Sequence, residues 1–397
     1  MAAVDIYLHD TFVGVLTHRS TLGDATEFRL DDAYRDDPRR PVLGQVFEDD
    51  PGRVWRTTHR VPSWFSNLLP EGQLRTLLAE HSGVHPEREL HLLAALGEDL
   101  PGAVTAVPRD GDGLTAAPLR PAHGPVDPDE ALRFSLAGMQ LKFSMDRDEK
   151  GLTLPVRGRG GRWIVKLPDP RYEAVPVNEA TMLSWAEASG IDVPAHALIE
   201  PEDIRGLPAS IGALAPGPAL AVRRFDRPDA GGRVHIEDFA QIRGVWESDK
   251  YRAASYDNIG QVLLALCGEA CAEQYVRRLA FMLLSGNADM HLKNWSLCYP
   301  DGRHPQLAPA YDLVATRAFP GTSRPLALKL SGARHFEAVD RETFRRFAQR
   351  LGLPPDAVVT WVEETQARAR AAWPRFRAAL PLRQQAAMDD HLAQLRL

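Results

Sequence analysis

The first hundred residues combine short alternating segments with longer amphipathic ones. Residues 4–16 alternate between apolar and polar side chains around a polar turn, which predicts a β-hairpin. Leucines recur at helical spacing between residues 61 and 83, and Gly83 is a typical residue for the end of that helix. A second helix and a strand are predicted over 87–108. We therefore expect residues 1–107 to form an N-terminal α/β subdomain.

The apolar pattern stops after this segment and returns in a different form. Residues 108–131 are rich in Pro, Gly and Asp and have no period, which predicts a linker between domains. From residue 132 the chain consists of short apolar runs separated by polar turns, with one helical segment at 177–190. Residues 132–235 are therefore predicted to form a small, β-rich lobe.

The remainder of the chain is predicted to be helical. Residues 256–268 and 273–286 have the composition of strongly apolar helices. Apolar residues after position 340 recur with the i, i+3, i+4, i+7 spacing of an amphipathic helix. Residues 236–397 should thus form an all-helical C-terminal lobe. The predicted fold class is α+β, and a β-rich lobe followed by a helical lobe is a common arrangement in enzymes that hold ATP between them.

Composition narrows the function classes. A chain of 397 residues is long enough for two or three packed units, and 44% hydrophobic with 25% charged residues indicates a globular protein. The formal net charge of −6 argues against a dedicated nucleic-acid binder, which is usually basic. Three cysteines are too few for a disulfide framework and fit a reducing compartment. With no signal peptide or membrane-spanning run in the sequence, we expect a cytoplasmic protein.

A group of polar residues follows directly after the apolar segment 273–286. Asp289 and Asn294 are five positions apart, and Asp312 follows a predicted strand 18 residues after Asn294. Phosphoryl transfer needs a carboxylate beside the acceptor hydroxyl and oxygen ligands for Mg²⁺. These three residues are candidates for both tasks.

Two further segments complete this set. Lys166 lies within an apolar strand, where an ammonium is costly unless it is paired or bound, so it is the predicted cation for the phosphates. Glu179, early in the following helix, is its candidate partner. Residues 135–142 form a small-residue turn whose backbone amides are predicted to cover the phosphates, with Lys142 at its end.

Each residue taken alone has a simpler structural explanation. Asp289 and Asp312 can close turns, and Asn294 can cap the next segment. Lys166 can lie at a strand edge. Their order along the chain nevertheless favours a phosphotransferase. A metal hydrolase built on these carboxylates and the nearby histidines lacks a compact ligand motif, and a serine hydrolase lacks G-x-S-x-G.

With these motifs the chain resembles the HipA family of bacterial serine/threonine kinases, the toxin half of HipBA-type toxin–antitoxin modules. "FSLAGMQLKFSM" resembles the phosphate loop of that family, and "WIVKLP" its lysine strand. "GNADMHLKNWSL" and "APAYDLVA" resemble the catalytic and metal loops. "FSNLLPEG" and "LGEDLPGAV" resemble its N-terminal subdomain, so the resemblance covers most of the chain. It implies a two-lobed protein-kinase-like fold.

The resemblance also implies a role for each matching residue. Asp289 would be the catalytic base, and Asn294 and Asp312 would bind Mg²⁺. Ser135 matches the serine that the family autophosphorylates to inactivate itself, since a dianion within a phosphate-binding turn would repel ATP. The residues that match the family's ATP contacts are Ala137, Gly138, Met139, Gln140, Leu141, Lys142, Lys166, Arg224, Phe225, His291, Lys293 and Tyr311.

The chain departs from the family pattern at three of its positions. Arg223 stands where the hinge strand usually has Glu, and Met139 and Leu141 replace a small residue and a Glu in the phosphate loop. Two other function classes therefore stay open. One is a small-molecule kinase of the aminoglycoside-phosphotransferase type, and the other is a non-catalytic, partner-binding HipA-like protein.

Cofactors and partners are implied by the same resemblance. The cofactors would be ATP and Mg²⁺, and the substrate a cytoplasmic protein, with an aminoacyl-tRNA synthetase as the leading candidate. Phosphorylation of that target would arrest growth. The implied partner is a small DNA-binding antitoxin of the HipB type, through which alone the chain would contact DNA.

Overall fold

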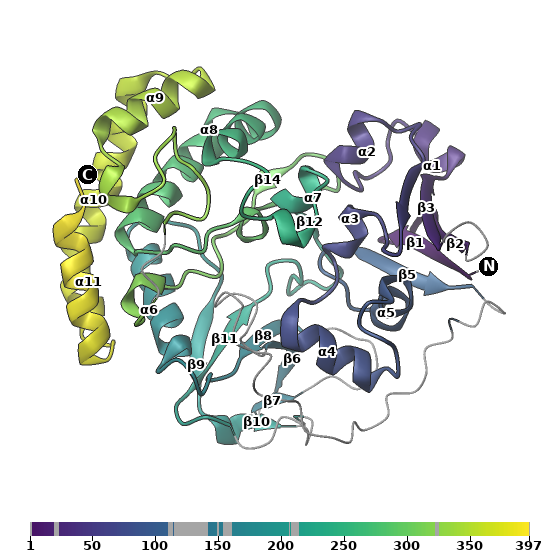
Figure 1. The fold of residues 1–397 in the computed structure, drawn as a ribbon, viewed down its shortest axis with the longest axis horizontal. Helices are drawn as coiled ribbons and strands as arrows, with labels where there is room; N and C mark the ends of the chain where they lie inside the picture. Colours follow the sequence, from purple (N-terminus) through teal and green to yellow (C-terminus); the bar gives the residue numbers. More distant parts are fainter. Residues whose placement is uncertain are drawn as a thin grey trace.

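The structure of this chain, a computed structural model, describes most of its length (Figure 1). The described residues form three sheets, of five, six and three strands, together with the helices that pack on them. These residues are 2–19, 24–109, 114, 142–148, 151–153, 161–205, 207, 214–321 and 325–396.

The N-terminal unit, defined here as residues 2–109, is built on an antiparallel sheet with strand order β4-β3-β2-β1-β5. β1 and β2 form the predicted hairpin, and their inward-facing apolar residues pack with Phe28 in a buried core. The strands are β1 (Ala2–Leu8), β2 (Thr11–Arg19), β3 (Ala25–Leu30), β4 (Trp55–Thr58) and β5 (Val104–Pro108). The helices are α1 (Asp32–Asp36), α2 (Gln45–Asp49), α3 (Ser63–Ser66), α4 (Gly72–His81) and α5 (Glu89–Leu96).

The small lobe contains the second sheet, with strand order β10-β7-β6-β8-β11-β9. β8 pairs with β6 on one side and β11 on the other, so both of its edges are covered. α6 packs on this sheet and has Pro176 in its first turn. Proline is well tolerated there because the N–H groups of a first turn have no acceptor within the helix. The elements are β6 (Lys142–Asp148), β7 (Gly151–Thr153), β8 (Trp163–Lys166), α6 (Val175–Ala188), β9 (His196–Ile199), β10 (Ile204–Arg205) and β11 (Ala219–Arg223).

The large lobe is mainly helical, but it is not all-helical as predicted, because it also contains a small antiparallel sheet in the order β12-β13-β14. Gly268, with a φ of 78°, interrupts α8 between the two predicted helical segments. In the described part of the chain, none of the helices is long and apolar enough to cross a membrane. The elements are β12 (His235–Asp238), α7 (Phe239–Ile242), α8 (Tyr256–Leu284), β13 (Ser296–Tyr299), β14 (Gln306–Leu307), α9 (Arg341–Leu351), α10 (Pro355–Arg377) and α11 (Leu382–Gln394).

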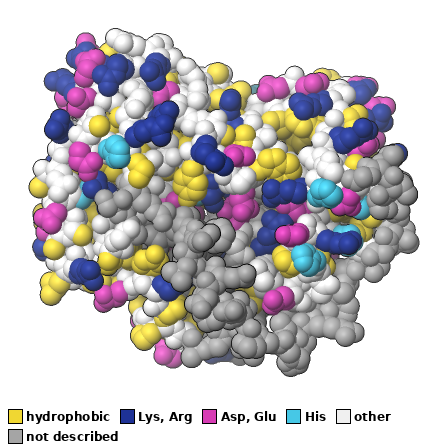
Figure 2. All heavy atoms as spheres, viewed as in Figure 1, with side chains coloured by type: hydrophobic (Ala, Val, Ile, Leu, Met, Phe, Trp, Pro, Cys, Tyr) yellow, Lys and Arg dark blue, Asp and Glu magenta, His cyan; other side chains and the backbone are white. Residues whose placement is uncertain are grey.

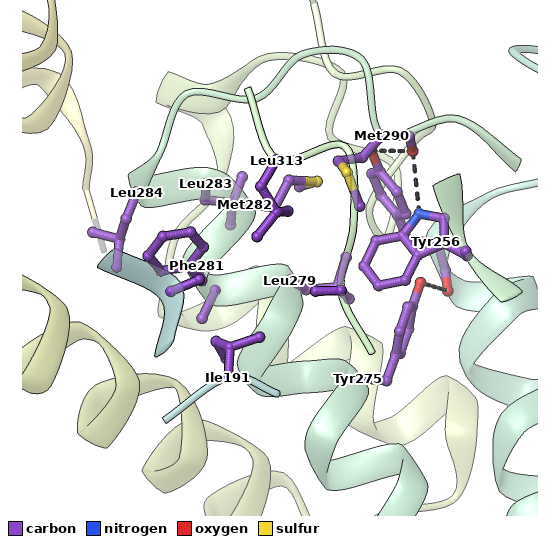
Figure 3. Packing of buried hydrophobic residues seen from close by; sticks show 14 of the residues in the cluster. Ile191, Tyr256, Tyr275, Leu279, Phe281, Met282, Leu283, Leu284, Met290 and Leu313 are labelled. Atoms are coloured by element: carbon purple, nitrogen blue, oxygen red, sulfur yellow. Dashed lines mark hydrogen bonds between the residues drawn. The ribbon is translucent and has the colours of Figure 1, made fainter. Parts of the chain in front are cut away.

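The core of the large lobe surrounds the C-terminal half of α8 and extends into the loop that follows it (Figure 3). In that loop the backbone carbonyl of Met290 accepts hydrogen bonds from the Tyr256 hydroxyl (3.1 Å) and the Trp295 indole (3.3 Å). The Tyr275 hydroxyl in turn donates to the Tyr256 carbonyl (2.9 Å). The loop after α8 is therefore attached to the core through buried aromatic side chains.

One buried carboxylate joins the N-terminal unit to the large lobe. Glu237 on β12 is fully buried and accepts hydrogen bonds from the Gln45 backbone N–H (3.0 Å), the Trp64 indole (2.9 Å) and the Tyr299 hydroxyl (2.9 Å). Burial is the main influence and raises the pKa of Glu237 to about 7, although the hydrogen bonds from Trp64 and Tyr299 act to lower it. This carboxyl group therefore changes its charge near neutral pH.

Glu237 should make the stability of the protein depend on pH. Its pKa is about 7 in the folded state against 4.5 for an ordinary glutamate, so between these pH values the folded state holds the proton more tightly than the unfolded state. The contribution of Glu237 to stability therefore falls as the pH rises through this range. Relative to Glu237→Gln, which does not titrate, the free energy of unfolding of the native chain should fall by about 2 kcal/mol between pH 5 and pH 8.

Urea denaturation of both proteins at several pH values measures this difference. Glu202→Gln, a change at an exposed carboxylate, is the matched control and should show no such trend. A constant difference between native chain and Glu237→Gln over the whole range would mean that the four hydrogen-bond contacts keep Glu237 ionised when folded.

Candidate active site

A pocket lies where the small lobe meets the large lobe. Its walls come from β6, β8 and α6 on one side and from the loops after α8 and β14 on the other. The residues that line it are Lys142, Lys166, Val175, Glu179, Asn287, Asp289, Asn294, Asp312, Val314 and Thr316. Those among them that the sequence pointed to are Lys142, Lys166, Glu179, Asp289, Asn294 and Asp312.

The ammonium of Lys166 lies between two carboxylates. It donates hydrogen bonds to Glu179 on α6 (2.6 Å) and to Asp312 of the large lobe. Burial acts to lower the pKa of Lys166, but Asp312 and Glu179 outweigh it and the pKa is raised. Lys166 is therefore protonated at neutral pH, and its charge connects the two lobes.

Asp312 reaches the pocket from a left-handed backbone conformation. Its φ is 52°, a region that Asp occupies more readily than most residues. The backbone carbonyl of Asp312 accepts a hydrogen bond from the side chain of Asn287 (3.2 Å). Burial acts to raise the pKa of Asp312, but Lys166 and then Lys142 lower it below its usual range. Asp312 is therefore ionised, and its side chain keeps 24% of its surface exposed.

Asp289 is fixed through its backbone and its side chain. The backbone N–H donates to the Asn287 side-chain oxygen (3.0 Å), and the backbone carbonyl accepts from the Asn294 side chain (2.8 Å). The carboxylate accepts a hydrogen bond from the Tyr251 hydroxyl (2.5 Å). Asp289 is 8% exposed. The spacing of Asp289 and Asn294 thus has a structural basis, because the second side chain closes the loop on the first.

Lys293 and His291 belong to the same loop but are not among the residues that line the pocket. The Lys293 ammonium pairs with Glu71 of the N-terminal unit (2.7 Å) and donates to the Asn67 carbonyl (3.1 Å). The His291 ring is buried edge-on against Tyr251, with ring centroids 4.9 Å apart. Burial lowers the pKa of His291 to about 3, so the ring is neutral. Neither side chain lines the pocket, and their contact with a nucleotide stays a prediction.

The expected hinge residues contact neighbouring residues and do not line this pocket, and their role toward the adenine stays a prediction. Arg224 forms ion pairs with Asp226 (2.9 Å) and with Asp99 of the N-terminal unit (3.1 Å). Phe225 packs against Tyr311, with ring centroids 5.9 Å apart. These side chains connect the hinge to its neighbours, and the pocket lining contains none of them.

Several sequence predictions fall outside the described residues. They concern Ser135, the nucleotide loop from Ala137 to Leu141, and all of the linker 108–131 except residues 108, 109 and 114. Of the predicted phosphate-binding turn, the structure describes Lys142, which is exposed and lines the pocket.

Sequence reasoning missed residues that hold the pocket together. The hydroxyl of Thr316 accepts from the Ala288 N–H (2.7 Å) and donates to the Gly286 carbonyl (3.1 Å). Asn287 directly follows the buried helix, where its sequence position indicates only the end of that helix. Tyr251 lies 38 positions before its partner Asp289, and no local pattern connects the two.

A β-rich lobe and a helical lobe, with a buried strand lysine paired to a helix glutamate and two aspartates from the large lobe in one pocket, define a kinase-like fold. Family models match this chain twice: HipA N-terminal domain over residues 4–107 and HipA-like C-terminal domain over residues 134–373. The chain therefore belongs to the HipA family, and the predicted α+β, two-lobed fold is confirmed.

Individual relatives agree with this assignment. The chain is 42% identical over its whole length to "Putative kinase Y4dM" of Sinorhizobium fredii, of which it covers 98%. It is 26% identical to "Serine/threonine-protein kinase toxin HipA" of Shewanella oneidensis, over 90% of this chain and 85% of that protein. The solved complex of S. oneidensis HipA with HipB and operator DNA contains a chain with the same fold. The TM-score is 0.76 at 22% identity, over 99% of this chain and 96% of that one.

The role of Asn287 can be tested through stability. Asn287→Ala removes the acceptor for the Asp289 N–H and the donor to the Asp312 carbonyl, both in a buried loop. Leaving such groups without partners should lower the free energy of unfolding by about 2 kcal/mol. Gln349→Ala, at an exposed position on α9, should change it by less than about 0.5 kcal/mol. Equal stability of the two variants in urea denaturation would contradict a bridging role for Asn287.

Proposed function

We propose that this chain is an ATP- and Mg²⁺-dependent protein kinase that transfers phosphate to serine or threonine hydroxyls. The observation that carries the proposal is the meeting of Lys166, Asp289 and Asp312 in one pocket between the lobes. A cation, a carboxylate for the acceptor and a carboxylate for the metal are the groups that phosphoryl transfer requires. The names of the relatives, including the serine/threonine kinase of S. oneidensis, support this reaction class.

Lys166 is the group that binds the phosphates of the nucleotide. Its ammonium is held by Glu179 of α6, which keeps it at the pocket wall. Its second partner, Asp312, belongs to the other lobe, so the same ammonium can bridge a triphosphate and the large lobe. Lys142 adds a second positive charge to the pocket lining, which favours an anionic ligand.

The residues of the large lobe suit a Mg²⁺ ion. Mg²⁺ prefers oxygen ligands and is usually held by one or two carboxylates together with substrate phosphates and water. Asp312 provides an ionised carboxylate. The nitrogen of the Asn294 amide is used by the Asp289 carbonyl, so its oxygen is the atom left for a cation. A bound Mg²⁺ would neutralise charge on the triphosphate.

Asp289 orients the acceptor hydroxyl and takes its proton. The Tyr251 hydroxyl, 2.5 Å from this carboxylate, supports the role because it occupies the position of a hydroxyl donor. As the acceptor oxygen bonds to the γ-phosphorus, the bond from that phosphorus to the β–γ bridging oxygen breaks and the proton passes to Asp289. Asp289 then releases the proton to water. Catalysis consists mainly of positioning and charge stabilisation.

We also propose a HipB-like, DNA-binding antitoxin as partner, a cytoplasmic target with an aminoacyl-tRNA synthetase as the first to assay, and autophosphorylation at Ser135. The S. oneidensis HipA with this fold was solved with HipB and operator DNA. This chain has a net charge of −6, and Figure 2 shows Lys and Arg interspersed with Asp and Glu over the described part of one face. Such a charge distribution favours DNA contact through the partner.

Phosphate transfer can be measured by intact-mass spectrometry after incubation of the phosphatase-treated chain with ATP and Mg²⁺. The native chain should gain about 80 Da per transferred phosphoryl group. Asp289→Ala should reduce the rate by about 10²–10⁴-fold because the acceptor loses its base. Asp312→Asn and removal of Mg²⁺ by EDTA should have comparable effects. Asp390→Ala, an exposed carboxylate on α11, is the matched control and should transfer phosphate at the native rate.

Ser135→Ala separates self-modification from transfer in general. It should abolish the mass gain while phosphate transfer to a protein acceptor continues. Transfer by Asp289→Ala at the native rate would overturn the catalytic assignment. Phosphorylation of an aminoglycoside with no transfer to any protein would show the small-molecule kinase instead, and absence of both ATP binding and transfer would show a non-catalytic protein.

A further inference from the structure

A single carboxylate of the N-terminal unit reaches the loop that carries the proposed catalytic residues. Glu71 directly precedes α4, and each of its carboxylate oxygens pairs with one ammonium of the large lobe. Oε2 is 2.6 Å from the Lys250 nitrogen, and Oε1 is 2.7 Å from the Lys293 nitrogen. All three side chains are largely buried, with 9–17% of their surfaces exposed. Glu71 therefore links two separate segments of the large lobe.

Both of these segments hold Asp289 in place. Lys250 is followed by Tyr251, whose hydroxyl donates to the Asp289 carboxylate. Lys293 is followed by Asn294, whose side chain donates to the Asp289 carbonyl. The two segments are also joined directly, because the backbone N–H of Leu292 donates to the Lys250 carbonyl (3.2 Å). Glu71 thus closes a ring of contacts around Asp289 without touching it.

The charges make this arrangement depend on Glu71. Lys250 and Lys293 are two buried ammoniums that repel one another, and a buried charge without a partner is strongly unfavourable. Two further carboxylates act on Lys293, those of Asp238 and Glu247, and the carboxylate of Asp238 is 4.0 Å away. Glu71 is the carboxylate that pairs directly with both lysines. Burial acts to raise the pKa of Glu71, but Lys293 and Lys250 lower it well below its usual range, so Glu71 is ionised.

The helix behind Glu71 is anchored elsewhere. Leu74 and Leu77 of α4 pack against the core of the small lobe. The start of α4 therefore contacts the catalytic loop of the large lobe, while its side packs on the sheet that carries Lys166. Figure 1 shows α4 beside β6 and β8. One helix of the N-terminal unit connects both sides of the pocket.

We infer that Glu71 is a positioning residue for the phosphoryl transfer proposed above, acting on Asp289 through Lys250 and Lys293. The inference rests on the proposed function. It assigns to the N-terminal unit a part of the active-site architecture, and it assigns to Lys293 a role in holding the catalytic loop in place of a contact with the nucleotide.

Glu71→Gln tests the inference because it removes the charge and keeps the shape. Transfer from γ-³²P-ATP to the chain itself and to casein is followed as a function of ATP concentration. The rate at saturating ATP should fall by about 10- to 100-fold, since small displacements of a catalytic group have effects of this size. The ATP concentration for half-maximal rate should stay within about two-fold, because Glu71 is not in the pocket lining.

The matched control is Glu80→Gln, which removes a charge from an exposed position on the same helix and should leave both parameters unchanged. Lys250→Gln and the double variant Glu71→Gln/Lys250→Gln test whether the two residues act together. If Glu71 acts through Lys250, the double variant should be as active as the less active of the two single variants, because the two losses are not additive. Native rates in Glu71→Gln, or additive losses in the double variant, would overturn the inference.

Hydrogen exchange without ATP separates this inference from the proposed function. The Leu292 amide should exchange at least about ten-fold faster in Glu71→Gln than in the native chain and Glu80→Gln. Its hydrogen bond to the Lys250 carbonyl joins the two segments that the ion pairs of Glu71 hold together. If the Leu292 amide exchanges faster in Glu71→Gln but the native chain transfers no phosphate, the structural role of Glu71 stands and the kinase proposal is overturned. If the Leu292 amide exchanges at the same rate in Glu71→Gln and the native chain does transfer phosphate, only the positioning role of Glu71 is overturned.

Discussion

The buried ammonium of Lys166 is the constraint on which the arrangement of the two lobes depends. A charge removed from water is stable only beside partners of opposite sign, and its partners come from different lobes, Glu179 from α6 and Asp312 from the loop after β14. α6 is fixed in turn by the large lobe, because Trp185 packs against Trp373 of α10 with ring centroids 4.6 Å apart. The pocket lies where β8, α6 and the loop after β14 meet around Lys166.

The same principle extends to the N-terminal unit. Glu237 of the large lobe is buried among donors from the N-terminal unit, and Arg224 of the hinge pairs with Asp99. Charged groups at these junctions have partners across a boundary between units as well as within one, as the Arg224–Asp226 pair and the Tyr299–Glu237 hydrogen bond show. The apolar cores cross the same boundaries, since one core packs residues of α6 and β11 with the helices of the large lobe, and α4 packs on the core of the small lobe. Apolar packing and shared charges together therefore orient the units around the pocket.

Local patterns in the sequence predicted what local physics determines. Hydrophobic periodicity predicted the N-terminal hairpin, the break in α8 at Gly268 and the strand that carries Lys166, and the chemistry of phosphoryl transfer selected pocket residues such as Asp289. The partner of Lys293 could not be predicted, because Glu71 belongs to another unit and periodicity contains no information on contacts between charges so distant in sequence. For the same reason the ion pairs of Lys293 with Glu71 and of Arg224 with Asp99 could not be predicted from the sequence, and the predicted contacts of Lys293 and Arg224 with a nucleotide stay predictions.

The carboxylate of Glu237 has a consequence for how this chain can evolve. Its backbone neighbours belong to the segment matched by one family model, and three of its hydrogen-bond contacts come from the segment matched by the other. Recombination between distant relatives at the boundary of the two segments would join a buried acid to a surface that lacks its donors. A functional chimera should therefore keep Trp64 and Glu237 from the same parent, whereas the donor at position 45 is a backbone N–H that other residues would also supply.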